Sequence, residues 1–308
     1  MNEDALPQRP RTRDVLLKPV ITVVIPHLNQ PVNLARCLAS LAENTRQPDE
    51  IIVVDNGSHT LPDVPDNVTL LQEKTPGPGP ARNLGMAKAK GNVLAFLDAD
   101  CLARFDWLEE AERRIIRADI LGGDMRIGYS DPANLTMTEA YESVYSFRIK
   151  RYIDEENFAA TANLVVRREI LEAVGPFGGL HLAEDRDWGQ RAVAMGYEIS
   201  YAPRMRVYHP ARRTFLELYI KWDRQMAHDY GEISDGQGRL RWWLKTAAMG
   251  LSPLAEISRI AASDRIKGLG PRIKAFVGLC RIRLYRMGRM VDLGLRGRPE
   301  RLAARWNR

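Results

Sequence analysis

Two aspartates one residue apart follow a short apolar run. The run is Val93–Leu97, and Asp98 and Asp100 come directly after it. Five apolar residues in a row are typical of a strand buried on both faces of a largely parallel sheet. If the chain stays extended to Cys101, both carboxylates point the same way and could bind one divalent cation. The alternative is that the two aspartates only begin a loop and cap a helix.

A second acidic pair, Glu184 and Asp185, stands in the first turn of a helix that we expect after the glycine-containing segment 178–183. Adjacent helical positions diverge by about 100°. We therefore expect the two carboxylates to have different roles. The helix macrodipole also favours negative charge in a first turn, so a purely structural role stays open.

Other polar residues stand where further strands are expected to end. Segments 20–26 and 50–54 are predicted strands; Pro26 ends the first, and Asp55 follows the second. In open α/β sheets, ligands bind at the carboxyl ends of the strands because the crossover loops converge there. Asp55 is therefore expected at the same edge of the sheet as Asp98.

The segment Pro76–Gly85 alternates proline and glycine and leads into a helix predicted over 81–90. A helix N-terminus offers unpaired N–H groups to an anion, and Arg82 adds a bidentate donor for phosphate or carboxylate. The alternative is a loop whose prolines and glycines only set its path.

The remaining apolar periodicity completes an alternation of strands and helices. Helices are predicted over 31–41, 107–117, 136–152, 168–174 and 214–230, and extended segments over 68–72, 120–127, 162–166, 198–202 and 205–209. His209 ends the last of these segments. A lone histidine there is either a metal ligand or a structural residue.

The composition excludes several classes of protein. The chain has 308 residues, is 45% hydrophobic and contains three scattered cysteines, which fit neither a disulfide framework nor a zinc site. This usage favours a reducing compartment. Residues 1–18 form a polar tail without the apolar core of a signal peptide. We find no apolar run of the roughly 18 residues that a membrane-spanning helix needs.

The charge of the chain is divided unevenly along its length. Residues 239–308 hold 17 Lys or Arg and 4 Asp or Glu, a net charge of +13, whereas the whole chain carries +6. The pattern here predicts long basic helices. Residues Ile273, Phe276, Val277, Cys280, Leu284, Met287, Val291 and Leu295 project into one apolar stripe.

That stripe has two interpretations. It could lie in the headgroup region of an anionic membrane, with the arginines beside it. Alternatively, it could pack on the α/β domain that precedes it while the arginines are solvated. Leu279, Ile282 and Leu293 project onto the opposite, supposedly polar side, which supports at least partial burial against protein.

Five motifs, in order over about 20–230, resemble the family 2, inverting glycosyltransferases of the GT-A fold. The motifs are a strand ending Ile25-Pro26 with Asn29 after it, Val-Val-Asp-x-Gly-Ser ending at Ser58, Ala81-Arg-Asn-x-Gly85, Asp98-x-Asp100 and Glu184-Asp185. Two features depart from the family pattern: His27-Leu28 replaces Thr-Tyr, and Asn56 stands where many relatives have a second Asp. Both leave the donor open.

The resemblance implies a role for each matching residue. Asp185 would be the general base, with Glu184 beside it. The residues that would bind the nucleotide sugar are Pro26, Asn29, Asp55, Arg82 and Asp98. A Mg²⁺ or Mn²⁺ cofactor would be held by Asp100, with Asp98 and His209. The implied fold is α/β: a Rossmann-like mixed sheet flanked by helices over 19–235, with a basic helical extension over 236–308.

The implied activity is metal-dependent, inverting transfer of a sugar from a nucleoside-diphosphate sugar to a hydroxyl of a glycan or lipid-linked acceptor. The processive Gln-x-x-Arg-Trp motif is missing, which favours a single transfer in cell-surface glycan or glycolipid synthesis. We expect the protein in the cytoplasm, peripheral on the cytoplasmic face of the plasma membrane. One alternative is transfer to a polyprenyl phosphate. Another is a nucleic-acid- or membrane-binding protein that acts through its basic tail, although nucleic acid would leave the acidic motifs unexplained.

Overall fold

The chain folds into two compact units. The structure, a computed structural model, describes residues 18–180, 183–231, 233 and 235–297. One unit combines the residues up to 126 with 147–209, and the other combines 127–146 with the residues from 210 onward. The domain boundary predicted at 235 stays a prediction. Clustered by contacts, the second unit also contains residues 127–146 and 210–235.

Eight strands of the described chain form one sheet in the order β3-β2-β1-β4-β7-β6-β8-β5. The strands are β1 (Ile21–His27), β2 (Glu50–Asp55), β3 (Val68–Gln72), β4 (Val93–Leu97), β5 (Leu102–Ala103), β6 (Ile120–Gly128), β7 (Asn163–Arg167) and β8 (Ile199–Pro210). Strands β3, β2, β1 and β4 run parallel, whereas β7 is antiparallel to both β4 and β6. The sheet is therefore mixed rather than largely parallel. The two extended pieces predicted over 198–209 are one strand, β8.

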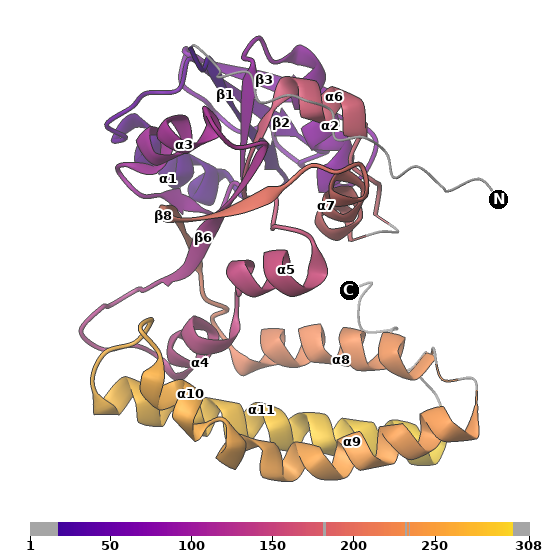
Figure 1. Ribbon diagram of the computed structural model, residues 1–308. Helices are drawn as coiled ribbons and strands as arrows, with labels where there is room; N and C mark the ends of the chain where they lie inside the picture. Colours follow the sequence, from indigo (N-terminus) through magenta and orange to yellow (C-terminus); the bar gives the residue numbers. More distant parts are fainter. Residues whose placement is uncertain (1–17, 181–182, 232, 234, 298–308) are drawn as a thin grey trace, which may run out of the picture. The chain divides into compact units, whose positions relative to one another are not determined.

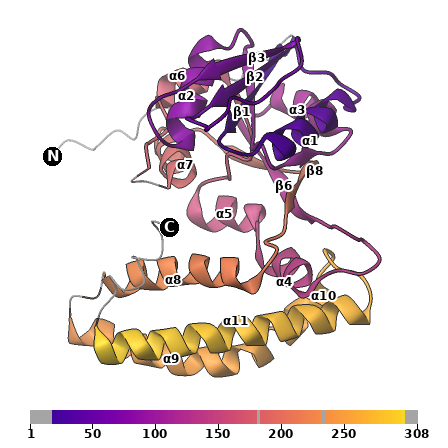
Figure 2. The same ribbon diagram turned by 180° about the vertical axis from the view of Figure 1, so that it is seen from behind.

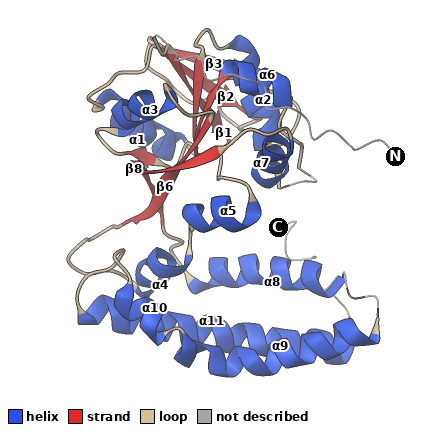
Figure 3. Ribbon diagram, viewed as in Figure 1, coloured by secondary structure: helices blue, strands red, loops and turns tan. Residues whose placement is uncertain are grey.

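Six helices of the described chain belong to the first unit: α1 (Pro31–Ala42), α2 (Pro78–Lys88), α3 (Trp107–Ile115), α5 (Ile149–Glu156), α6 (Arg168–Val174) and α7 (Glu184–Ala194). Figure 3 shows α1 and α3 on one side of the sheet and α2 and α6 on the other. Helix α1 begins at a proline, which suits the first turn, and its predicted apolar positions Leu34, Cys37, Leu38 and Leu41 are all buried.

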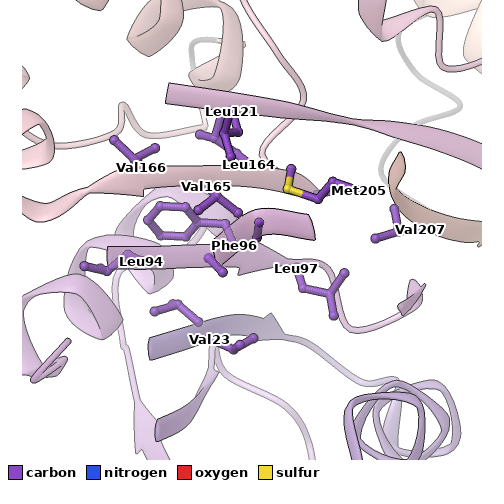
Figure 4. Packing of buried hydrophobic residues seen from close by; sticks show 14 of the residues in the cluster. Val23, Leu94, Phe96, Leu97, Leu121, Leu164, Val165, Val166, Met205 and Val207 are labelled. Atoms are coloured by element: carbon purple, nitrogen blue, oxygen red, sulfur yellow. The ribbon is translucent and has the colours of Figure 1, made fainter. Parts of the chain in front are cut away.

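Strand β4 lies at the centre of the core. All five of its residues are fully buried, and Figure 4 shows Phe96 among Val23 of β1, Val165 of β7 and Leu121 of β6. The prediction of a strand buried on both faces is confirmed. The strand ends at Leu97, however, and the N–H of Cys101 donates to the carbonyl of Asp98 at 3.0 Å. The two aspartates therefore stand in a turn, not in an extended segment.

The single helix predicted over 136–152 is wrong. Two helices occupy this segment, α4 (Met137–Tyr145) and α5, and the break falls at 146–148. Phe147 has a φ of 51°, in the left-handed region that a β-carbon disfavours. The break coincides with the unit boundary, because α4 belongs to the second unit and α5 to the first.

The second unit is helical. Helix α11 (Leu269–Arg296) packs against α4, α8 (Phe215–Gly231), α9 (Gly236–Ala255) and α10 (Ile257–Ala262) (Figure 2). Leu279, Ile282 and Leu293 of α11 are buried in this unit's apolar clusters. The apolar stripe predicted on α11 faces away from these clusters, since its residues Ile273, Val277, Leu284 and Leu295 are exposed. Within the described ranges, no helix has the length and apolarity needed to cross a bilayer.

Candidate active site

A cavity of about 520 Å³ lies in the first unit at the carboxyl ends of β1 and β4. Most of the predicted site residues line it: Pro26, Arg82, Asp98, Asp100, Glu184, Asp185 and His209. Asn29 and Asp55 do not belong to the lining. Four carboxylates from two distant parts of the sequence therefore face one space.

Arg82 connects two of these carboxylates. Its Nη2 donates to Asp98 Oδ1 at 2.7 Å and its Nη1 to Glu184 Oε1 at 2.9 Å. The guanidinium is only 3% exposed, so the two ion pairs are shielded on the arginine side. The planar fork of arginine suits such bridging. Arg82 thereby neutralises much of the charge that Asp98 and Glu184 bring to the cavity.

Helix α2 is held close to the sheet, which fixes the position of Arg82. The helix begins after Gly77, whose φ of 122° favours glycine, and Pro78 stands in its first turn. A β-carbon at Gly85 would lie 2.4 Å from Val24 of β1. Glycine at this position therefore lets the helix approach the strand.

Asp100 lies beside His209, which comes from the end of β8. The Oδ2 of Asp100 is 3.3 Å from His209 Nε2, and the Phe147 ring packs on the histidine with a centroid distance of 4.7 Å. Burial alone would raise the pKa of Asp100, but its hydrogen bond and charge interaction with His209 hold that pKa below the ordinary value. Asp100 is thus kept ionised.

The donors at this end of the cavity suit a hard divalent cation. A carboxylate and an imidazole already adjoin at Asp100 and His209, and Asp98 lines the same space. Among the described residues, no three His, Cys, Asp or Glu side chains are grouped to hold an ion alone. Mg²⁺ that acts on phosphates takes one or two carboxylates and completes its shell with substrate oxygens and water. The residues present therefore fit an ion of this kind.

Asp185 differs from its neighbour Glu184. It accepts a hydrogen bond from the N–H of Arg186 at 2.8 Å, but it has no ion-pair partner in the part of the chain that the structure describes. Burial raises the pKa of Asp185 above the ordinary value, and the nearby charge of Glu184 acts in the same direction. The two adjacent acids thus occupy different electrostatic environments, as their helical positions predict.

The Asp55 carboxylate accepts hydrogen bonds from other residues of the chain. His27 Nδ1 donates to Asp55 Oδ1 at 2.9 Å, because the Nε2 of the same ring accepts the N–H of Gln30. The N–H groups of Gly57 and Ser58 donate to Oδ2 of Asp55. Burial opposes ionisation, but the hydrogen bonds from Ser58 and His27 hold the pKa of Asp55 below its usual range. The predicted contact of Asp55 with a nucleotide base stays a prediction.

Asn29 belongs to the same loop. It has a φ of 52°, its N–H donates to Ser58 Oγ at 2.8 Å, and its Oδ1 accepts the N–H of His59. The asparagine therefore joins the loops that follow β1 and β2. Its predicted contact with the donor likewise stays a prediction.

Asn56, which departs from the family pattern, has a structural reason to be an amide. Its Nδ2 donates to the carbonyls of Glu73 and Thr75, and its Oδ1 accepts the N–H of Gly77. An aspartate cannot donate either bond. Asn56 therefore ties the loop after β2 to the start of α2, and it lines the cavity.

Sequence reasoning missed two residues that shape the site. Asn83 forms two hydrogen bonds with the backbone of Phe177, both at 2.9 Å. The Asn83 Oδ1 accepts the N–H of Phe177, and the Asn83 Nδ2 donates to the carbonyl of Phe177. The Ala-Arg-Asn motif contains this signal, because asparagine next to Arg82 can both donate and accept. Phe147, which lines the cavity beside His209, stands in a segment predicted as mid-helix.

Comparison with known proteins identifies relatives. A family model described as Glycosyl transferase family 2 matches residues 22–175. Glycosyltransferase AglE of Haloferax volcanii is 33% identical over 241 residues, which are 73% of this chain and 75% of that protein. The pre-mycofactocin glycosyltransferase of Mycobacterium tuberculosis is 29% identical over 237 residues, 70% of this chain but only 46% of its own.

A solved structure shares the fold. The mannosyltransferase PcManGT from Pyrobaculum calidifontis, in complex with GDP-Man and Mn²⁺, superimposes with a TM-score of 0.52 at 16% identity, covering 92% of this chain and 89% of its own. At this identity the likeness concerns the fold alone. The predicted fold class, a mixed α/β sheet of GT-A type flanked by helices with a C-terminal helical region, is confirmed.

Proposed function

This chain belongs to glycosyl transferase family 2 and is a glycosyltransferase, and we propose that it moves a sugar from a nucleoside-diphosphate sugar to an acceptor hydroxyl with inversion. The observation that carries the proposal is the division of labour among the carboxylates of one cavity. Asp98 and Glu184 share the single positive charge of Arg82, Asp100 adjoins His209, and Asp185 has a raised pKa.

The donor end of the proposed site is the region around Asp100. Asp100, Asp98 and His209 would hold Mg²⁺ or Mn²⁺, which acts as a Lewis acid toward the departing diphosphate. Pro26, Arg82, Asn29 and Asp55 complete the proposed donor site, the last two by shaping the loops after β1 and β2. The complex of PcManGT with GDP-Man and Mn²⁺ supports this assignment by analogy of fold.

The acceptor end is the region around Asp185. An acceptor hydroxyl must lose its proton as it attacks, and a carboxylate with a raised pKa is suited to take that proton. Glu184 is less suited to take the proton, because its carboxylate forms an ion pair with Arg82. A single base and direct displacement invert the anomeric configuration, so no second nucleophilic carboxylate is needed.

The wider setting is part of the same proposal. The enzyme would add one sugar per encounter to a glycan or lipid-linked acceptor, in cell-surface glycan or glycolipid synthesis. It would act in the cytoplasm, on the inner face of the plasma membrane. The basic second unit supports this location, because anionic lipids attract clustered Lys and Arg.

Titration calorimetry with a panel of nucleoside-diphosphate sugars, with and without Mn²⁺, tests the donor site. We expect one donor to bind in an ion-dependent way, with at least about tenfold weaker binding to Asp100→Ala, since a tenfold loss corresponds to about 1.4 kcal/mol. The matched control is Asp63→Ala, which removes an exposed aspartate that does not line the cavity. Ion-independent binding, or equal binding by both variants, would contradict the assignment of Asp100 to the donor site.

A further inference from the structure

Helix α9 carries an apolar stripe that faces away from the core of its own unit. Leu240, Leu244, Leu251 and Leu254 are between 61% and 73% exposed. At 100° per residue they fall within an arc of roughly 80°. Isolated exposed leucines are common, but an aligned set along about four helical turns is not.

The opposite side of α9 already supplies the packing that the helical unit needs. Trp242, Thr246, Met249 and Pro253 are buried, and they project about 180° from the exposed leucines. A helix that packs on one partner needs one apolar face. The second apolar face of α9 is therefore unexplained by the fold of this unit.

Helix α11 has the same two-sided character. Ala275, Leu279, Ile282 and Leu293 are among its buried residues. The predicted stripe projects to the other side, and Ile273, Val277, Leu284 and Leu295 within it are 43% to 74% exposed.

The two exposed stripes adjoin. Helices α9 and α11 lie side by side and antiparallel, because Trp242 Nε1 donates to the carbonyl of Met290 and Arg283 Nη1 contacts Met249 Sδ (Figures 1 and 2). A β-carbon at Gly294 would lie 2.7 Å from the Trp243 ring, so the helices approach closely on that flank.

Trp243 meets Gly294 and Gly250 meets Met287, and on each helix these contacts project between the buried and the exposed stripe, so both exposed stripes face the same side. We call the exposed set the outer apolar face: Leu240, Leu244, Leu251, Leu254, Ile273, Val277, Leu284 and Leu295.

Cations border the outer apolar face. Residues 236–297 contain 13 Lys or Arg and 3 Asp or Glu. Arg239 and Arg241 project to the two flanks of the α9 stripe, about 100° from Leu240 on either side. Both are exposed, and neither has an ion-pair partner in the described part of the chain. An apolar face with clustered cations beside it complements a surface that is apolar inside and anionic at its rim.

We propose that the outer apolar face of α9 and α11 binds the headgroup region of an anionic membrane. Basic amphipathic helices lie in the interface plane, with their apolar side chains among the lipid tails and their cations at the lipid phosphates. A second copy of the chain is the poorer occupant, because self-association would bring two strongly basic surfaces together.

The inference rests on the membrane location in the proposed function and names the surface that binds there, and lipid binding can be measured without any sugar donor. We would mix the full chain with vesicles of phosphatidylcholine alone or with about one third phosphatidylglycerol, and measure binding by flotation. We expect binding to the anionic vesicles, weaker binding at high salt because exposed charges are screened, and little binding to the neutral ones.

Paired variants locate the surface. The double variant Leu244→Glu/Leu251→Glu should bind anionic vesicles at least tenfold more weakly. The matched control is Leu216→Glu, which changes an equally exposed leucine on α8 in the same unit. Circular dichroism and thermal melting of both variants check that the fold is kept.

Three results would overturn the inference: no vesicle binding by the wild type, equal binding by the double variant, or concentration-dependent dimers that the double variant abolishes while vesicle binding is unchanged. Failure of the proposed function looks different. An inactive protein that still floats with anionic vesicles would reject the donor site and keep the membrane surface. Donor binding without flotation would do the reverse.

Discussion

At the scale of single residues, the cavity separates carboxylates of one chemical type by their surroundings. Asp98 and Glu184 share the Arg82 guanidinium, Asp100 adjoins His209, and Asp185 is desolvated beside the charge of Glu184. In the proposed function, environment rather than residue type would assign ion binding and proton removal to different groups.

The pH dependence of donor hydrolysis tests the assignment of Asp185. A base works when ionised, and the pKa of Asp185 is raised, so the rate should fall as pH decreases through a value above the ordinary aspartate pKa of about 3.9. Asp185→Asn should remove this acid limb and lower the rate by about 10²–10⁴-fold. Asp187→Asn, in the same helical turn but outside the cavity, should keep both. An unchanged rate in Asp185→Asn would assign proton removal to another group.

Removal of the Arg82 guanidinium tests whether that side chain holds the two carboxylates together. Arg82→Met leaves Asp98 and Glu184 as unpaired like charges, so we expect the free energy of unfolding to fall by about 1–3 kcal/mol, discounted because both acids are partly exposed. Urea unfolding measures it. Arg151→Met, which breaks an exposed pair with Glu155, should cost less than about 1 kcal/mol. Equal losses in the two variants would mean that the Arg82 bridge stabilises the fold no more than an exposed ion pair does.

At the scale of elements, α2 organises the site because it carries Arg82 toward the carboxylates and Asn83 toward the loop before α7. Gly79 lies against that loop so closely that a β-carbon would be 1.9 Å from the carbonyl oxygen of Gly178. The helix, the loop and the Glu184-Asp185 pair are therefore positioned together.

Asn83→Asp tests this connection. Aspartate can accept the N–H of Phe177 but cannot donate to its carbonyl, so we expect about 1–2 kcal/mol less stability in urea unfolding. Asn33→Asp is the matched control, because its side-chain bond to Gln30 has the same 2.9 Å length but is exposed. A change there should stay within about 0.5 kcal/mol. If the two variants lose equal stability, the hydrogen bonds between Asn83 and Phe177 contribute no more than an exposed side-chain bond.

The elements also show where sequence patterns succeed. The buried strand β4 and the buried face of α1 were predictable because local apolar runs and helical spacing report burial directly. The partners of Arg82 were not, since Asp98 and Glu184 are 16 and 102 residues away in the chain. The stripe on α11 was predictable, but not which way it faces, because Leu279, Ile282 and Leu293 make the other side apolar too.

At the scale of the whole molecule, the chain combines two units with different chemistry. The cavity with its carboxylates belongs to the first unit, and the outer apolar face with its cations belongs to the second. The charge asymmetry along the sequence reflects this division. We therefore expect donor chemistry and membrane binding to be lost separately, by Asp100→Ala in one case and by Leu244→Glu/Leu251→Glu in the other.

The most direct test of the central claim is hydrolysis of a panel of nucleoside-diphosphate sugars by the purified chain, with Mn²⁺ or with EDTA. We predict slow release of one particular nucleoside diphosphate that needs the ion, is lost in Asp100→Ala and is kept in Asp63→Ala. If no donor is cleaved under any metal condition, or if cleavage continues in EDTA and in Asp100→Ala, the proposed metal-dependent sugar transfer is contradicted.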